Sequence, residues 1–137
     1  MAVHTDKNFR FELVSPERIL LSTEAEMVTI PGEMGDFGVL VHHAPLISSL
    51  RPGVIAVTVK KDQVLRFFVS GGFADVSQTH CSVLAETAEN LSELDANQID
   101  VDLSHARDDF AMAESHQEKT RLLKHIHILE VKRRAIS

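Results

Sequence analysis

Hydrophobic and polar residues alternate along the first two-thirds of the chain, in the period-two pattern of strands that are half-buried in a sheet. Residues 9–13 show it most clearly, and residues 54–59 add a run of β-branched side chains, which favour strands. Residues 64–69 follow after a polar turn and complete a predicted hairpin. Further apolar runs of strand length occupy residues 18–21, 27–30, 39–41, 46–47, 73–76 and 81–85. Many short strands at this spacing predict an all-β sandwich or barrel.

The segment 31–53 is the richest in turn-forming residues, and the sequence predicts a turn at each of its ends. Gly32, Gly35 and Gly38 recur every third residue, which predicts positive φ angles and close approaches of the backbone. The spacing is weakly similar to a dinucleotide-binding loop. That motif needs a helix after the glycines, and here Pro45 follows instead. We therefore expect two short strands joined by a corner rather than a phosphate site.

The pattern changes near Thr87, and neither Gly nor Pro occurs after Ala85. Two capping boxes, at residues 92–95 and 115–118, predict the starts of two helices. Apolar residues then recur at steps of three and four, at Ala96, Ile99, Leu103, Ala106, Phe110 and Ala113, and again at Leu122, Ile126 and Leu129. The sequence therefore predicts an αα-hairpin, with a β-sandwich domain at residues 1–88 and a helical domain at 89–137.

Charge is divided between the two predicted helices. From Glu86 to Glu118 there are ten acidic residues and one basic residue, Arg107. After Glu118 there are six basic residues and one acidic residue, Glu130. An acidic helix beside a basic helix is electrostatically complementary, although each exposed pair contributes only about 0–1 kcal/mol.

Composition restricts the function further. The chain has 137 residues, 44% of them hydrophobic and 25% charged, as in an ordinary globular protein. Its net charge of −6 argues against a general nucleic-acid binder. No apolar run is long enough to span a membrane, and the first residues lack the pattern of a secretory signal. The single cysteine, Cys81, excludes an internal disulfide. It is expected to be an unreactive apolar residue of a strand.

Eight histidines raise the question of a metal site. His42 and His43 are adjacent, so on a strand they point to opposite faces. His125 and His127 are two residues apart, so they do not share a helix face. We therefore expect no metal site, and no nucleophile stands in a recognisable catalytic motif. The residues alone indicate a non-catalytic β module with a helical arm.

Three motifs in this order resemble one known family: Pro-Gly-x-x-Gly-x-x-Gly-Val-Leu-x-x-His-Ala-Pro-Leu from Pro31, then the segments 71–76 and 83–88. The chain is similar to the epsilon subunits of bacterial F-type ATP synthases, whose mitochondrial equivalent is called delta. The resemblance extends over nearly the whole chain. It implies an N-terminal antiparallel β-sandwich of about ten strands, followed by a C-terminal two-helix hairpin.

The resemblance also implies a role without catalysis. Such a subunit lies in the central stalk of a proton-translocating ATP synthase, at the cytoplasmic face of the bacterial inner membrane, and links the gamma subunit to the c ring for rotary coupling. By the resemblance, Glu33, Met34, Gly35 and Asp36 contact the c ring and His43 faces gamma. No nucleic acid and no insertion into the membrane are implied.

In this family the helical hairpin extends toward the alpha and beta catalytic subunits and hinders ATP hydrolysis, or folds back, in some members with ATP bound. The matching ATP motif here is incomplete: Leu94 and Asp95 fit, whereas Gln98 stands where the family has Arg. Because the phosphate-binding guanidinium is missing, we expect no cofactor and disfavour ATP binding. Two alternatives stay open, a free-standing nucleotide-sensing regulatory module and a small β-sandwich enzyme.

Overall fold

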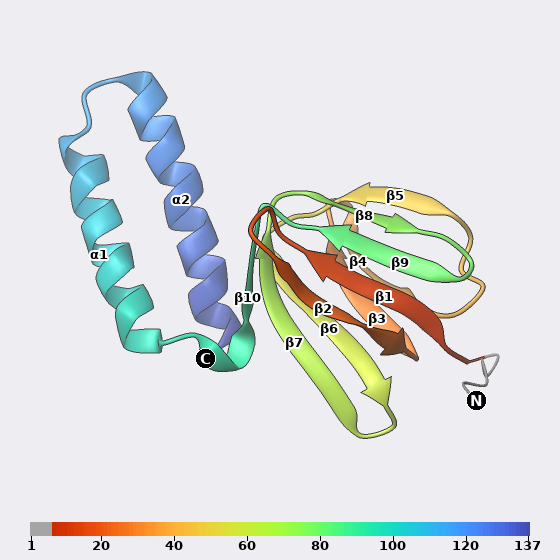
Figure 1. Cartoon of the computed structure of the whole chain (residues 1–137). Coiled ribbons are helices and arrows are strands. Elements are labelled where there is room, and N and C mark those ends of the chain that lie inside the picture. The colour runs from red at the N-terminus through yellow and green to blue at the C-terminus, as the bar shows by residue number, and fades with distance from the viewer. Residues whose placement is uncertain (1–6) are drawn as a thin grey trace. The chain divides into compact units, whose positions relative to one another are not determined.

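The computed structural model describes residues 7–137 and divides the chain into two compact units (Figure 1). The units are Met1–Asn90 and Leu91–Ser137, and each has its own cluster of buried apolar side chains. The division lies two residues beyond the boundary expected from the sequence, because residues 87–90 form a strand that the sequence pattern did not indicate.

Ten strands in the described part of the chain form two five-stranded sheets. The strands are β1 (Phe9–Val14), β2 (Ile19–Ala25), β3 (Met27–Gly32), β4 (Gly35–Val39), β5 (Leu46–Ser49), β6 (Gly53–Lys60), β7 (Gln63–Ser70), β8 (Phe73–Val76), β9 (His80–Leu84) and β10 (Thr87–Asn90). One sheet has the order β2-β1-β9-β8-β5, and the other β10-β7-β6-β3-β4. The predicted β-sandwich followed by two helices is therefore confirmed.

One strand pair departs from the antiparallel arrangement. β1 and β9 pair in parallel, from Arg10 opposite His80 to Val14 opposite Leu84. The other strand pairs among residues 7–90 are antiparallel, as expected. A parallel pair requires a long connection, and here seven intervening strands supply it.

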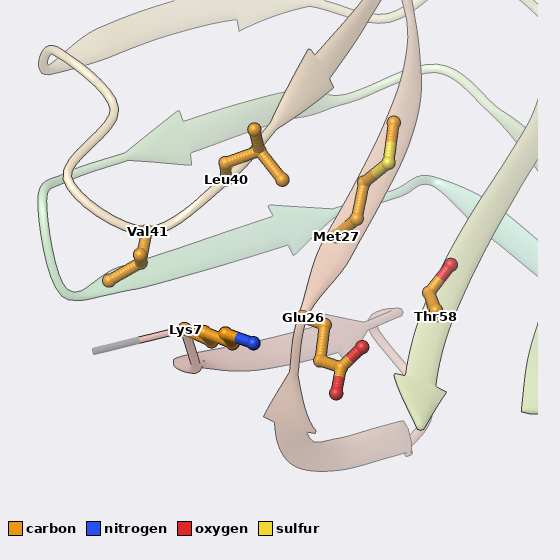
Figure 2. Close-up of a pocket in the computed structure, with 6 residues that line it drawn as sticks. All are labelled: Lys7, Glu26, Met27, Leu40, Val41 and Thr58. Atoms are coloured by element: carbon orange, nitrogen blue, oxygen red, sulfur yellow. The ribbon is translucent and has the colours of Figure 1, made fainter. Parts of the chain in front are cut away.

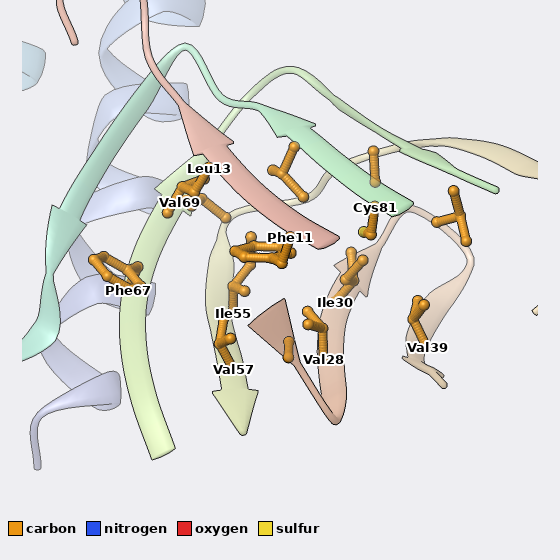
Figure 3. Close-up of a cluster of buried hydrophobic side chains, with 14 of the residues drawn as sticks. Phe11, Leu13, Val28, Ile30, Val39, Ile55, Val57, Phe67, Val69 and Cys81 are labelled. Carbon is orange, nitrogen blue, oxygen red and sulfur yellow. The ribbon is translucent and has the colours of Figure 1, made fainter. Parts of the chain in front are cut away.

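The core lies between the inner faces of the two sheets (Figure 3). Along β1, Phe9, Phe11 and Leu13 are buried, whereas Arg10 is exposed and Glu12 is half-buried. The opposite sheet contributes the branched side chains of Val28, Ile30, Val39, Ile55, Val57 and Val69. Burying one such side chain contributes roughly 1.5–3 kcal/mol, so the alternation read from the sequence is also the main source of stability.

The second unit is a helical hairpin of α1 (Ala96–Met112) and α2 (His116–Ala135), preceded by a 3₁₀ turn at Leu91–Glu93. Its core contains Ile99, Leu103, Ala106 and Leu129, with Leu94, Ile126 and Ile136 packed against them. The predicted apolar stripes therefore face each other.

Only the second of the two predicted capping boxes begins a helix. The hydroxyl of Ser115 accepts a hydrogen bond from the backbone N–H of Glu118 at 3.1 Å, as a helix cap does. The first capping box is wrong, because Ser92 lies in the 3₁₀ turn and Asp95 caps α1 instead. The Asp95 carboxylate accepts from the N–H of Asn97 at 2.9 Å. A carboxylate at this position also offsets the positive end of the helix dipole.

Two ion pairs join the helices, in agreement with the division of charge. Arg133 Nε lies 2.9 Å from Asp100 Oδ1, and Arg107 Nη2 lies 3.5 Å from Glu130 Oε2. The second pair joins the one base of the acidic segment to the one acid of the basic segment. Because these side chains are partly exposed, each pair adds at most about 1 kcal/mol to the free energy of unfolding. The pairs act mainly on the register of the two helices.

We predict that a chain ending at Asn90 folds without the helices, because the first unit contains a complete core. Far-ultraviolet circular dichroism should show a β spectrum and a cooperative thermal transition. A chain ending at Glu86 also loses β10, which pairs with β7 from Thr87 to Asn90, and should be less stable by about 2 kcal/mol from lost hydrogen bonds. An unfolded 1–90 chain would contradict the independence of the two units.

Candidate functional site

The four residues expected to contact the c ring lie together at the β3–β4 hairpin. β3 ends at Gly32 and β4 begins at Gly35, so Glu33 and Met34 form the turn. The turn expected at Pro31-Gly32 is therefore wrong, since both are strand residues. The hairpin ends in an exposed tip, where the side chain of Met34 is 99% exposed.

The three glycines of this segment have different roles. Gly35 has a φ of 132°, which only glycine adopts without strain. Gly32 permits a close approach, since a Cβ there would lie 2.8 Å from the Phe37 ring and 2.9 Å from the Gly35 oxygen. Gly38 does not have a positive φ, and the expectation of one there is wrong because Gly38 continues β4.

The end of β5 and the residues that follow it hold the hairpin next to its turn. The N–H of Glu33 donates to the Ser49 oxygen at 2.9 Å, and the N–H of Arg51 donates to the Pro31 oxygen at 3.0 Å. The Arg51 guanidinium also forms an ion pair with Asp36. Of the two acidic side chains near the tip, Asp36 is therefore paired with a residue outside the hairpin.

His43 lies beyond the other end of β4, in the corner before β5. The strand β4, whose five residues span about 17 Å at roughly 3.4 Å per residue, lies between the hairpin tip and this corner. Its Nδ1 lies 2.7 Å from the Ala44 oxygen, so this nitrogen, when protonated, donates within the corner. The structure thus places the predicted c-ring residues and the predicted gamma residue at opposite ends of one strand.

The corner contains a feature that the sequence pattern did not show. His42 has a φ of 67°, a left-handed conformation that is unfavourable for residues with a side chain. Its N–H donates to the Gln78 oxygen at 2.9 Å, in the β8–β9 loop. This hydrogen bond joins the corner to the β8–β9 loop, and it is made by a residue with a strained backbone.

An apolar row crosses the outer face of the β2-β1-β9-β8-β5 sheet. Phe73 pairs with Leu84, Leu84 with Val14, and Val14 with Ile19, so the four side chains are neighbours on adjacent strands. Phe73, Leu84 and Ile19 are 43%, 45% and 62% exposed. A pocket of about 580 Å³ lies beside them, lined by Val14, Phe73, Leu84 and the adjoining turns. The sequence analysis missed this row, although apolar residues at outward positions of β1, β8 and β9 were a signal for it.

A second pocket, of about 490 Å³, is lined in part by Leu40 and Val41, which precede His42 in the chain (Figure 2). Met27, Leu40 and Val41 supply apolar walls, and Lys7 and Glu26 are the charged residues that line it. No group of three or more potential metal ligands occurs among residues 7–137.

The positions of the incomplete ATP motif lie at the start of α1. Asp95 is occupied as the helix cap. The side-chain amide of Gln98 donates to the Asp102 carboxylate at 2.9 Å, one turn further along the same helix. Both polar side chains thus have partners inside α1.

Neither helix of the described chain is long and apolar enough to cross a membrane. Residues 8–91 match the family model for the β-sandwich domain of the ATP synthase delta/epsilon chain. Sequence relatives include the ATP synthase epsilon chain of Rhodospirillum rubrum, 47% identical over 80% of this chain and 81% of the relative. The epsilon chain of Parvibaculum lavamentivorans is 40% identical over 92% of this chain and 96% of the relative.

The chain belongs to the ATP synthase delta/epsilon family. The resemblance read from its motifs is confirmed, and the chain is a non-catalytic subunit of an F-type ATP synthase. Solved structures share the fold of this chain. A chain of the Euglena gracilis mitochondrial ATP synthase, solved with its OSCP, F1 and c ring, matches with a TM-score of 0.85 at 21% identity, over 100% of this chain and 86% of that one. A chain from the central stalk and c ring of the Tetrahymena thermophila enzyme matches with a TM-score of 0.68 at 13% identity, over 94% and 96%.

We predict that His42→Gly stabilises the protein by about 0.5–1 kcal/mol, because glycine adopts the left-handed conformation without strain. Urea denaturation followed by circular dichroism measures the change. His42→Ala is the matched control, because it removes the imidazole but keeps the Cβ that causes the strain. Equal stability of the glycine and alanine variants would show that the backbone at this corner is unstrained.

Cys81 should be unreactive in the folded protein. Burial, and secondarily the charge of Asp75, raises the pKa of its thiol from 9.0 to about 12. A difference of about three pKa units lowers the thiolate fraction at pH 8 about a thousandfold. Alkylation at pH 8 should therefore be slow in buffer and fast in denaturant.

The raised pKa of Cys81 also predicts how the stability of the protein changes at high pH. The thiol ionises at a lower pH in the unfolded chain than in the folded protein. The contribution of the buried neutral thiol to stability is therefore complete below pH 9.0 and is lost as the pH rises toward about 12. Rapid alkylation of the native protein at pH 8 would contradict the burial of this thiol.

Proposed function

We propose that this chain is the central-stalk subunit that links gamma to the c ring of a proton-translocating ATP synthase, and that it couples their rotation without chemistry of its own. Membership of the delta/epsilon family carries the proposal. Both matching structures include a c ring, and one is of the central stalk. The same membership supports a peripheral position at the cytoplasmic face of a bacterial inner membrane.

The gamma subunit is proposed to dock on the apolar row of Ile19, Val14, Leu84 and Phe73. Exposed apolar patches on small proteins mark interaction surfaces when their members are contiguous, and these four are neighbours by strand pairing. Phe73 is 43% exposed, and aromatic side chains, phenylalanine included, are enriched at the core of protein–protein interfaces. His43 belongs to a corner at the far end of this sheet and is a peripheral contact in this proposal.

The β3–β4 tip is proposed to contact the c ring. Glu33 and Met34 project from the turn without packing against the sandwich. A hairpin held next to its turn, with one free carboxylate and one apolar side chain at its tip, suits contact with the polar loops of a membrane ring.

The helical unit is proposed to act as a regulatory arm toward the alpha and beta subunits. Its own core and its two interhelical ion pairs support movement of the hairpin as one body. We propose that it does so without bound ATP, because Asp95 caps α1 and Gln98 bonds to Asp102.

Phe73→Asp in the full chain should weaken binding to purified gamma at least tenfold, which corresponds to about 1.4 kcal/mol. Isothermal titration calorimetry measures the affinity. Val64→Asp is the matched control, because Val64 is 37% exposed on β7 of the other sheet. Absence of gamma binding by the unmodified chain would overturn the stalk role. Equal affinities of the two variants would move the gamma site away from the apolar row.

A further inference from the structure

One side chain joins both strands of the β3–β4 hairpin next to its turn. The Arg51 Nη1 donates to the backbone oxygen of Gly32, the last residue of β3, at 2.6 Å. The Nη2 of the same guanidinium pairs with the carboxylate of Asp36, the second residue of β4. Arg51 itself belongs to neither strand, since it lies between β5 and β6.

The backbone of the same segment runs alongside β3. Gly32 forms an isolated bridge with Leu50, and the N–H of Arg51 donates to the Pro31 oxygen. At Gly53 a Cβ would lie 2.8 Å from the Pro31 ring, so the two segments are in close contact. These backbone contacts fix β3, whereas Arg51 reaches β4 through its guanidinium.

The edge position of β4 makes this contact important. Among residues 7–137, β4 is the outermost strand of its sheet and pairs only with β3. Beyond the Gly32–Gly35 pair the turn consists of Glu33 and Met34, which are exposed. Without a second support, a two-stranded ribbon at a sheet edge twists and bends more freely than strands inside a sheet.

We propose that Arg51 is a positioning residue, which aims the Glu33–Met34 tip by holding both strands of the hairpin. The planar guanidinium donates to two acceptors in fixed directions, which the single ammonium of lysine does not reproduce. The proposal rests on the proposed contact of this tip with the c ring. It also gives Asp36 a role inside the hairpin, as the partner of Arg51, in place of a free charge presented to the ring.

A spin label at the tip tests the proposal in the isolated chain. Met34→Cys introduces an exposed thiol, and the buried Cys81 does not compete for the label. We expect Arg51→Met to increase the mobility of the label severalfold and Arg51→Lys to give an intermediate value. Arg66→Met is the matched control, because Arg66 is an exposed arginine on β7, away from the hairpin. Unchanged mobility in Arg51→Met, with the midpoint of thermal unfolding preserved, would overturn the positioning role.

Exchanging the two charges distinguishes the effect of the Arg51–Asp36 ion pair from that of the hydrogen bond to the Gly32 oxygen. The double variant Asp36→Arg, Arg51→Asp restores an ion pair but leaves the Gly32 oxygen without its donor. If both contacts position the tip, the mobility of the label in the double variant lies between those of the unmodified chain and Arg51→Met. Mobility equal to that of the unmodified chain would show that the ion pair alone is sufficient. It would overturn the proposal that Arg51 must hold both strands.

Crosslinking in the assembled complex tests the consequence for the c ring. The Met34→Cys variant, labelled with a short reagent that carries one thiol-reactive and one photoreactive group, should become joined to the c ring on illumination when Arg51 is unchanged. The yield should fall severalfold when Arg51→Met is added. No crosslink in either background would overturn the proposed function, whereas the mobility result would stand. If the tip is crosslinked to the c ring with equal yield in both backgrounds, Arg51 is not needed for the contact with the ring.

Discussion

The burial of alternate side chains between two sheets is the constraint on which the first unit depends. Phe9, Phe11 and Leu13 fill the interior from β1, and Val28 and Ile30 meet them from β3. A slip of one residue in any of these strands would expose its apolar set and bury its polar set. The register is therefore fixed, and with it the positions of every turn and every outward-facing side chain.

The fixed register places the proposed partner contacts. β4 is short and is bounded by the Glu33–Met34 turn at one end and by the His42–His43 corner at the other. The apolar row of Phe73, Leu84, Val14 and Ile19 follows from the same register, because these positions are paired across adjacent strands and point away from the core. A rigid body with contacts on separate faces is suited to transmit force between two partners.

The two units are stabilised in different ways. The sandwich depends on contacts between residues that are distant in sequence, such as the parallel pair of β1 with β9. The hairpin depends on two neighbouring helices, with a small core and exposed ion pairs that contribute little each. The helical unit is therefore the part whose conformation is more easily changed by a partner.

Local sequence patterns were enough to predict the two-part architecture, most strands, both helices and the family, because periodicity and turn residues act over a few positions. They did not reveal β10, the parallel pair, the cap at Asp95 or the strained backbone of His42, since each depends on what the folded chain places beside those residues. Likewise, Gly32, Gly35 and Gly38 look equivalent in the sequence, but the fold distinguishes a close approach, a positive φ and an ordinary strand position. Folding also brought Arg51 to Gly32 and Asp36. Contacts between residues 15 and 19 positions apart arise from the path of the chain and have no local sequence signal.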